Sequence, residues 1–142
     1  MRTSPTPLVA RPAWYDRNPA SKVFYSSFSA SPHSLTERFS YTCPSGKKAL
    51  VEVLSARVER VTAATEADTA VAVFKFTPSG ATGYYILRSS IRTNNAGDKE
   101  DKAIGTTLVM CPGDKIQAFT FDLSTGGTCS YLLTMKITEF DA

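Results

Sequence analysis

The stretch GTCSYLLTMKITEF, residues 127–140, shows the clearest secondary-structure pattern in the chain. Apolar residues alternate along it, at Cys129, Tyr131, Leu133, Met135 and Ile137. Polar residues occupy most of the positions between them. Because successive side chains of a strand point to opposite faces, this stretch predicts a strand with one face in the core and the other towards solvent.

Three further stretches are similar in length and rich in the aromatic and β-branched residues that favour strands: AVAVFKFT (70–77), TGYYILRSSI (82–91) and KIQAFTFD (115–122). Turn sequences rich in Gly, Pro, Asn and Ser separate them at fairly even spacing. This organisation is typical of an antiparallel β-sandwich or a jelly-roll-like barrel, and we predict an all-β domain over residues 36–142. Of the adjacent tyrosines Tyr84 and Tyr85, one is expected to face outward.

Residues 48–61, within KKALVEVLSARVERV, admit two interpretations. Apolar residues recur at helical spacing, at Leu50, Leu54, Val58 and Val61, which suits an amphipathic helix. The four valines and the turn PSGKK directly before the stretch favour a long strand instead. In that strand a β-bulge would separate Ala49, Val51 and Val53 from Ala56 and Val58. We predict the strand, whereas a helix here would make the fold α+β.

Residues 1–35 are predicted to form an extended, proline-rich N-terminal arm. Five of the eight prolines lie in residues 1–33, which excludes a long helix or a central strand for most of this segment. Residues 1–40 carry five basic and two acidic side chains, so the net charge of +3 falls entirely in this part. Trp14, the only tryptophan, lies among these prolines, although a single tryptophan normally fills a core.

The sequence contains no arrangement that indicates an active site. The single histidine, His33, lies in a serine-rich stretch without a neighbour that would orient it as a general base. Cys43, Cys111 and Cys129 show no CxxC spacing and fit reduced, packed cysteines. The acidic residues of Asp98–Lys102 alternate with lysines, as in a solvated loop tip. We therefore predict a protein that is not an enzyme and has neither a cofactor nor a metal site.

Neither a membrane nor a nucleic acid is expected as a partner. No apolar run approaches the roughly 18 residues of a membrane span, and the N-terminus lacks the apolar stretch of about 7–15 residues found in secretory signals. The basic residues of the arm are scattered, whereas nucleic-acid-binding arms usually carry dense basic runs. An acidic protein surface fits this charge distribution better.

Residues 43–140 resemble small structural proteins of tailed-phage virions. The likeness covers PSGKKALVEVLSARVERVT, AVAVFKFTPSG and LVMCPGDKIQAFTFDLSTGGTCSYLLTMKITEF, in which a Gly-Asp turn and a Thr-Gly-Gly turn separate the strands. Such proteins are typically β-sandwich or jelly-roll modules. The resemblance implies a capsid decoration (cement) protein that binds the capsid surface and stabilises the shell, located in a virion assembled in the host cytoplasm. A tail or neck component is the alternative within the same class.

The resemblance also implies partners: further copies of the chain, with a trimer favoured, and the major capsid protein or another virion protein. In proteins of this class, extended arms often lie across neighbouring subunits. Aromatic and arginine side chains dominate interface energetics, so Arg11, Trp14, Tyr15 and Arg17 are the expected partner-contact residues. In a second interpretation the arm folds back and Trp14 covers one end of its own barrel. Outside the virion class, a carbohydrate-binding β-sandwich is the alternative function.

Overall fold

The computed structural model describes residues 20–28, 34–66, 68–92, 95–104 and 108–142, and for residues 20–28 and Val53 it describes the backbone alone. These residues form nine strands and no helix: β1 (Ala20–Phe28), β2 (Thr36–Thr42), β3 (Lys47–Thr62), β4 (Ala70–Thr77), β5 (Tyr84–Ile91), β6 (Lys99–Ile104), β7 (Leu108–Met110), β8 (Lys115–Asp122) and β9 (Thr128–Asp141). The predicted all-β class is confirmed.

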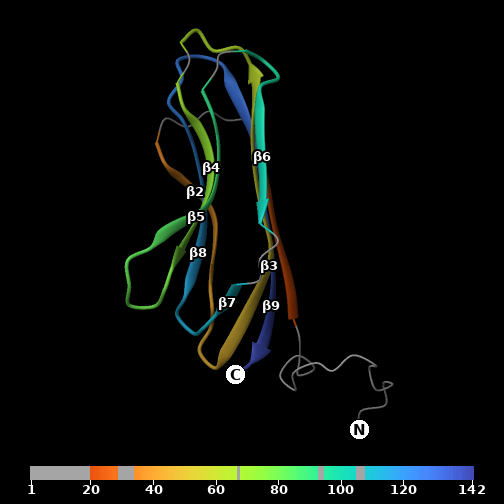
Figure 1. The fold of residues 1–142 in the computed structure, drawn as a ribbon, viewed down its shortest axis with the longest axis vertical. Helices are drawn as coiled ribbons and strands as arrows, with labels where there is room; N and C mark the ends of the chain where they lie inside the picture. The colour runs from red at the N-terminus through yellow and green to blue at the C-terminus, as the bar shows by residue number, and fades with distance from the viewer. Residues whose placement is uncertain (1–19, 29–33, 67, 93–94, 105–107) are drawn as a thin grey trace, which may run out of the picture.

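The strands form two antiparallel sheets that face each other (Figure 1). Sheet A has the order β1-β9-β3-β6, and β7 pairs with β3 beyond the end of β6. Sheet B has the order β2-β8-β4-β5. The chain changes sheet at every connection except β4–β5 and β6–β7. With β6 and β7 counted as one interrupted strand, this is the two-sheet arrangement of a jelly roll, which confirms the predicted β-sandwich.

The ambiguous stretch over residues 48–61 is a strand, as predicted. In β3 the core-facing residues are Ala49 and Val51, followed by Leu54, Ala56 and Val58. The pairing with β9 shifts register between Val51 and Val53, so a bulge is present, but it lies before Val53 and not after it as predicted. β9 borders β3 on one side, and β6 and β7 border it on the other. Pairing on both sides explains why residues with helical spacing nevertheless form a strand.

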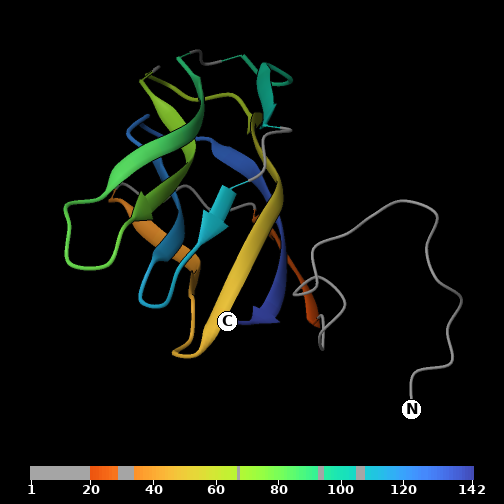
Figure 2. The same ribbon diagram turned by 60° about the horizontal axis from the view of Figure 1, so that its bottom comes forward.

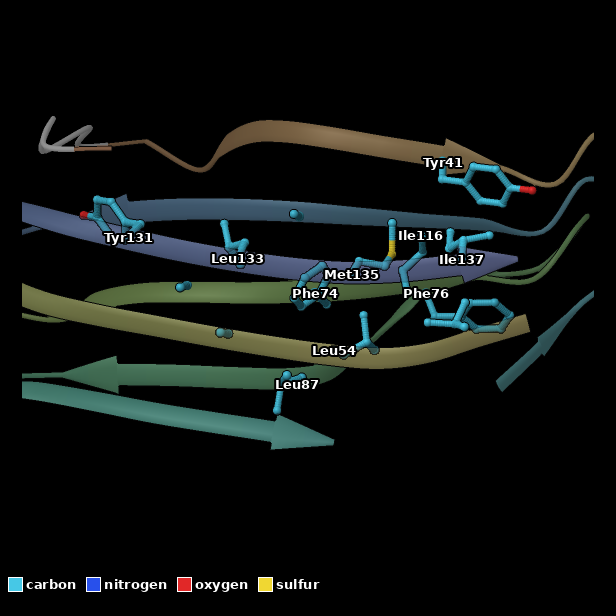
Figure 3. Packing of buried hydrophobic residues seen from close by; sticks show 14 of the residues in the cluster. Tyr41, Leu54, Phe74, Phe76, Leu87, Ile116, Tyr131, Leu133, Met135 and Ile137 are labelled. Atoms are coloured by element: carbon cyan, nitrogen blue, oxygen red, sulfur yellow. The ribbon is translucent and has the colours of Figure 1, made fainter. Parts of the chain in front are cut away.

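The core lies between the two sheets (Figure 3). The five alternating residues of β9 named above are all fully buried in it, as predicted. From sheet B, β4 contributes Phe74 and Phe76, and β8 contributes Ile116 and Ala118. Figure 3 shows Tyr41 and Tyr131 at opposite ends of this core. Side chains from both layers therefore share one apolar interior, as in other sandwiches.

β1 lies inside the segment predicted as the N-terminal arm. It pairs with β9 without interruption, from Ala20 opposite Glu139 to Phe28 opposite Tyr131. Figure 2 shows it at the margin of sheet A beside β9. The stretch SKVFYSSF is free of proline and rich in aromatic residues, which is the signal that could have identified it. His33 and the predicted contact residues Arg11, Trp14, Tyr15 and Arg17 lie outside the described residues, so their roles stay predictions.

Candidate interaction surface

A buried ion pair joins the two sheets at one end of the sandwich. The guanidinium of Arg60 on β3 donates to the carboxylate of Asp122 on β8 at 2.9 Å and to the hydroxyl of Ser124 at 2.7 Å. Neither charged side chain is exposed to solvent. The carboxylate also accepts hydrogen bonds from the Ser124 backbone N–H at 2.9 Å and from the Cys129 thiol at 3.3 Å. The donors to the Asp122 carboxylate named here therefore come from side chains and backbone of the sandwich itself.

The electrostatics of this cluster favour a structural role. Burial would raise the pKa of Asp122, but the hydrogen bonds from Arg60, Ser124 and Cys129 lower it overall. Burial and the negative charge of Asp122 raise the pKa of the Cys129 thiol to about 12. Burial, followed by the interaction with Cys129, also raises the pKa of Tyr131. A thiol that stays protonated at neutral pH is a poor nucleophile, and the hydrogen bonds of this cluster join the two layers.

A second polar contact joins the sheets at the opposite end. The Tyr41 hydroxyl on β2 donates to the carboxylate of Glu139 on β9 at 2.7 Å. Two turns with similar sequences, CPSG (43–46) and CPGD (111–114), lie side by side at this end. The backbone N–H of Gly113 in one turn donates to the carbonyl of Cys43 in the other at 2.9 Å. Each turn connects strands of different sheets. These contacts close the end of the core with hydrogen-bonded groups.

The outer face of sheet B is more apolar than the solvent-facing side of a sandwich usually is. On β4, Ala72 and Phe74 belong to the core, so the alternating residues Val71 and Val73 point to the outer face. Even so, Val71 is only 1% exposed and Val73 only 2%. On the same face Phe121 lies opposite Val71 and Phe119 lies opposite Val73, both of them half-buried.

Both valines and Phe121 contribute to a hollow of about 210 Å³ on the outer face. It is lined by Leu35, Val71, Val73, Tyr85, Arg88 and Phe121. A β-bulge brings Tyr85 into this wall: β5 and β4 shift register between Phe74 and Lys75, which leaves Ile86 without an opposite residue. The shift places Tyr85 opposite the outward Lys75, while Tyr84 packs its ring on Phe76 with centroids 5.8 Å apart. Re-aiming a side chain is a recurring use of bulges.

The hollow combines an apolar floor with one cation at its wall. The side chains that form its outer parts, Leu35, Tyr85 and Arg88, are exposed, with Tyr85 at 55%. Apolar and aromatic lining with a small number of polar groups is typical of binding sites, so the hollow is the candidate interaction surface. The prediction that one of the adjacent tyrosines faces outward is confirmed for Tyr85.

Two other kinds of site are absent over the part of the chain that the structure describes. No group of three or more His, Cys, Asp or Glu side chains there is arranged to hold a metal ion. No helix among those residues is long and apolar enough to cross a membrane.

No family model matches the chain, and no curated protein matches it. Among solved structures, it is similar to a structure of infectious bursal disease virus, Gx strain, with 10% identity, a TM-score of 0.43 and coverage of 96% of this chain and 37% of that one. The Gt strain gives 11% identity, a TM-score of 0.40 and coverage of 99% and 37%. Particles with T=1 symmetry derived from this virus give 12% identity, a TM-score of 0.34 and coverage of 87% of this chain and 36% of that one. The chain thus spans little more than a third of these proteins, and likenesses at this level do not establish a shared function.

Sequence reasoning missed the outer hollow, although a signal for it exists. The run AVAVF at residues 70–74 is apolar at every position, which indicates a strand covered on both faces rather than on one. Phe119 and Phe121 alternate with core residues of β8 and therefore share the outer face with the two valines. Read together, these two patterns predict an apolar outer surface on one sheet.

Proposed function

We propose that the protein is a non-enzymatic structural protein of a virion, and more specifically a capsid decoration protein that binds the capsid surface and its own copies. The observation that carries the proposal is the apolar outer face of sheet B. Its accessible apolar surface comes from Leu35 and Tyr85, which are exposed, and from Phe121, which is half-buried. An apolar hollow with few polar groups is typical of binding sites and suits a protein that attaches to another surface.

The topology supports the same class. Jelly rolls are the architecture of many viral capsid domains and also of lectins. Fold by itself does not imply function, so the topology narrows the choice without deciding it. The resemblance of residues 43–140 to virion proteins of tailed phages favours the virion reading. The buried ion pair of Arg60 and Asp122 and the protonated Cys129 thiol favour a non-catalytic role, because a catalytic group needs contact with substrate and a pKa near the working pH.

Particles from cells that carry the gene, compared with particles from the same cells after its deletion, test this function. We expect the full-length chain to co-purify with wild-type particles in a fixed ratio to the major shell protein. Particles without it should release their contents at lower temperature, and addition of the purified chain should restore the difference. Absence of the chain from purified wild-type particles would overturn the proposal.

A carbohydrate-binding module is the second candidate, favoured by the exposure of Tyr85 in the hollow. Sugars stack on exposed aromatic rings, and jelly-roll lectins exist. On this function, Tyr85→Ala would abolish binding to a glycan array while Tyr84→Ala, which alters a ring packed on Phe76 outside the hollow, would preserve it. A wild-type protein that binds no glycan would remove this candidate.

A further inference from the structure

We propose that the hollow on the outer face of sheet B receives Trp14 and Tyr15 from the N-terminal segment of a second copy of the chain. This inference rests on the proposed self-association and names the surface that would carry it. Val71 and Val73 close the bottom of the hollow and are only 1% and 2% exposed, so its accessible apolar surface comes from the walls of Leu35, Tyr85 and Phe121. An indole is the side chain that gains most from such a site, because it has the largest apolar area.

The chemistry of the segment complements that of the hollow. The sequence around the only tryptophan reads AWYDR, so an acidic residue, Asp16, follows the two aromatic residues directly. The hollow has Arg88 as its one charged lining residue, and this guanidinium also interacts electrostatically with Glu100. An aromatic pair seated against the walls would place a second carboxylate close to the guanidinium, where a charge-assisted hydrogen bond forms readily. The prolines at positions 12 and 19 restrict the unbound segment and lower the entropic cost of binding.

The distance along the surface indicates a second copy rather than the same one. Ala20 pairs with Glu139, whose carboxylate bonds to Tyr41, and Tyr41 lies opposite Ile116. The start of β1 is therefore level with Ile116, whereas the hollow lies at Phe121, five residues further along β8. That step measures about 17 Å along the strand. The segment begins on the edge of sheet A, and the hollow lies on the far side of sheet B.

The path around the sandwich is longer than the segment can span. The two sheets lie about 10 Å apart, and passing two strands sideways takes about 10 Å more. Combined with the step along the strand, even a direct route measures about 26 Å. Trp14 precedes Ala20 by six positions, which reach at most about 20 Å when fully extended. The fully extended backbone is therefore shorter than even the direct route, which favours docking on a second copy.

The test uses Trp14 fluorescence in the full-length chain, because the single tryptophan reports one position. We expect the wild-type emission to shift to shorter wavelength as protein concentration rises, in step with association measured by sedimentation. The double variant Leu35→Ala/Tyr85→Ala removes two exposed wall residues and should weaken association at least about tenfold. The matched control Tyr84→Ala/Val109→Ala removes two equally exposed apolar side chains outside the hollow and should associate like the wild type.

A mixing experiment separates docking between copies from docking within one copy. Trp14→Ala keeps the hollow and has no tryptophan, whereas Leu35→Ala/Tyr85→Ala keeps Trp14 and lacks the intact hollow. Neither variant alone should show the shifted emission. When they are mixed, the remaining Trp14 should enter the intact hollow of the other variant and its emission should shift.

Several outcomes would overturn the inference. These are unchanged association of Leu35→Ala/Tyr85→Ala, a wild-type emission that is shifted at every concentration, and a mixture that behaves as the sum of its parts. Binding of a glycan that requires Tyr85, without self-association, would assign the hollow to carbohydrate instead. A monomeric chain that still co-purifies with particles would refute this inference and the self-association, and would leave attachment to the capsid standing. An associating chain that is absent from particles would refute attachment to the capsid and leave this inference standing.

Discussion

Arg60 on sheet A and Asp122 on sheet B lie 2.9 Å apart, and neither is exposed to solvent. The pair sits at one end of the core, and the hydrogen bond between Tyr41 and Glu139 sits at the other. A third contact, from the Ser89 hydroxyl to the carbonyl of Ala56 at 2.7 Å, joins β5 to β3. The two layers, which share no disulfide among Cys43, Cys111 and Cys129, are thus joined by directional polar contacts as well as by apolar packing.

Asp122→Asn should lower the free energy of unfolding by about 3–5 kcal/mol, because it leaves the buried Arg60 guanidinium without its counter-charge. Urea unfolding followed by circular dichroism measures the loss. The matched control is Glu52→Gln on the surface, where Glu52 and Lys136 lie 3.9 Å apart, and it should cost less than about 1 kcal/mol. Equal losses in the two variants would show that the buried pair contributes no more than a surface pair.

The stabilising effect of Asp122 should disappear in acid. Because its pKa in the folded protein is lowered, the unfolded chain binds a proton at this carboxyl at higher pH than the folded chain does. Its contribution is therefore complete above the unfolded pKa of about 3.9 and is lost as pH falls through the lower folded value. The stability difference between wild type and Asp122→Asn should be constant near neutral pH and shrink between about pH 5 and pH 2. A constant difference down to pH 2 would contradict the lowered pKa.

The three cysteines should differ sharply in reactivity. Cys111 is exposed, whereas Cys43 and Cys129 are buried. Burial raises the pKa of the Cys43 thiol, and burial with the charge of Asp122 raises that of Cys129 to about 12. Iodoacetamide at pH 8 should add one group to the folded protein, at Cys111, and react with all three cysteines in urea. Peptide mapping by mass spectrometry identifies the sites, and rapid labelling of Cys129 in the folded protein would contradict its burial.

Tyr41→Phe should destabilise the fold by about 1–3 kcal/mol, because the buried carboxylate of Glu139 loses a donor at 2.7 Å. The control Tyr84→Phe removes a hydroxyl from a ring that is 54% exposed, and its effect should stay within about 0.5 kcal/mol. Thermal melts of both variants at neutral pH make the comparison. Similar melting temperatures for the two would show that the cross-sheet hydrogen bond adds nothing.

Two glycines offer a test of the turn before β9. Gly46 and Gly127 both have left-handed backbones, with φ of +77° and +76°. A Cβ at Gly46 meets nothing within 4 Å, whereas one at Gly127 lies 2.7 Å from the carbonyl oxygen of Thr62. Gly46→Ala should therefore cost only the conformational strain of about 1–2 kcal/mol. Gly127→Ala should cost clearly more, because the contact is with backbone that must shift, and urea unfolding would rank the two.

The elements predicted from the sequence are those whose own residues carry the pattern. Residues 127–140 alternate strictly because one face of β9 lies in the core along its whole length. The stretch over 48–61 was ambiguous because Leu50 and Val61 lie outside the buried face of β3, where they imitate helical spacing. Only the pairing of β3 with strands far along the chain decides its conformation, and no local window contains that information.

The features that escaped prediction depend on long-range placement. β1 exists through its ladder with β9, more than a hundred residues away in sequence. The hollow joins Leu35, before β2, to side chains of β4, β5 and β8, and the bulge at Ile86 turns Tyr85 into it. A bulge is set by register between two strands, so alternation counted along a single strand assigns such a tyrosine to the wrong face.

The register of β1 on β9 has a mechanical consequence. Ala20, the first residue of β1, lies opposite Glu139, near the end of β9. The start of β1 and the end of β9 therefore meet at the same end of sheet A. A force that pulls Ala20 away from Asp141 would act perpendicular to the strands and along the hydrogen bonds between them. It would break these hydrogen bonds one after another from this end, whereas a force along the strands would load all of them together. Under tension β1 would separate from β9 first and add its residues to the N-terminal segment, while β9 stays paired with β3.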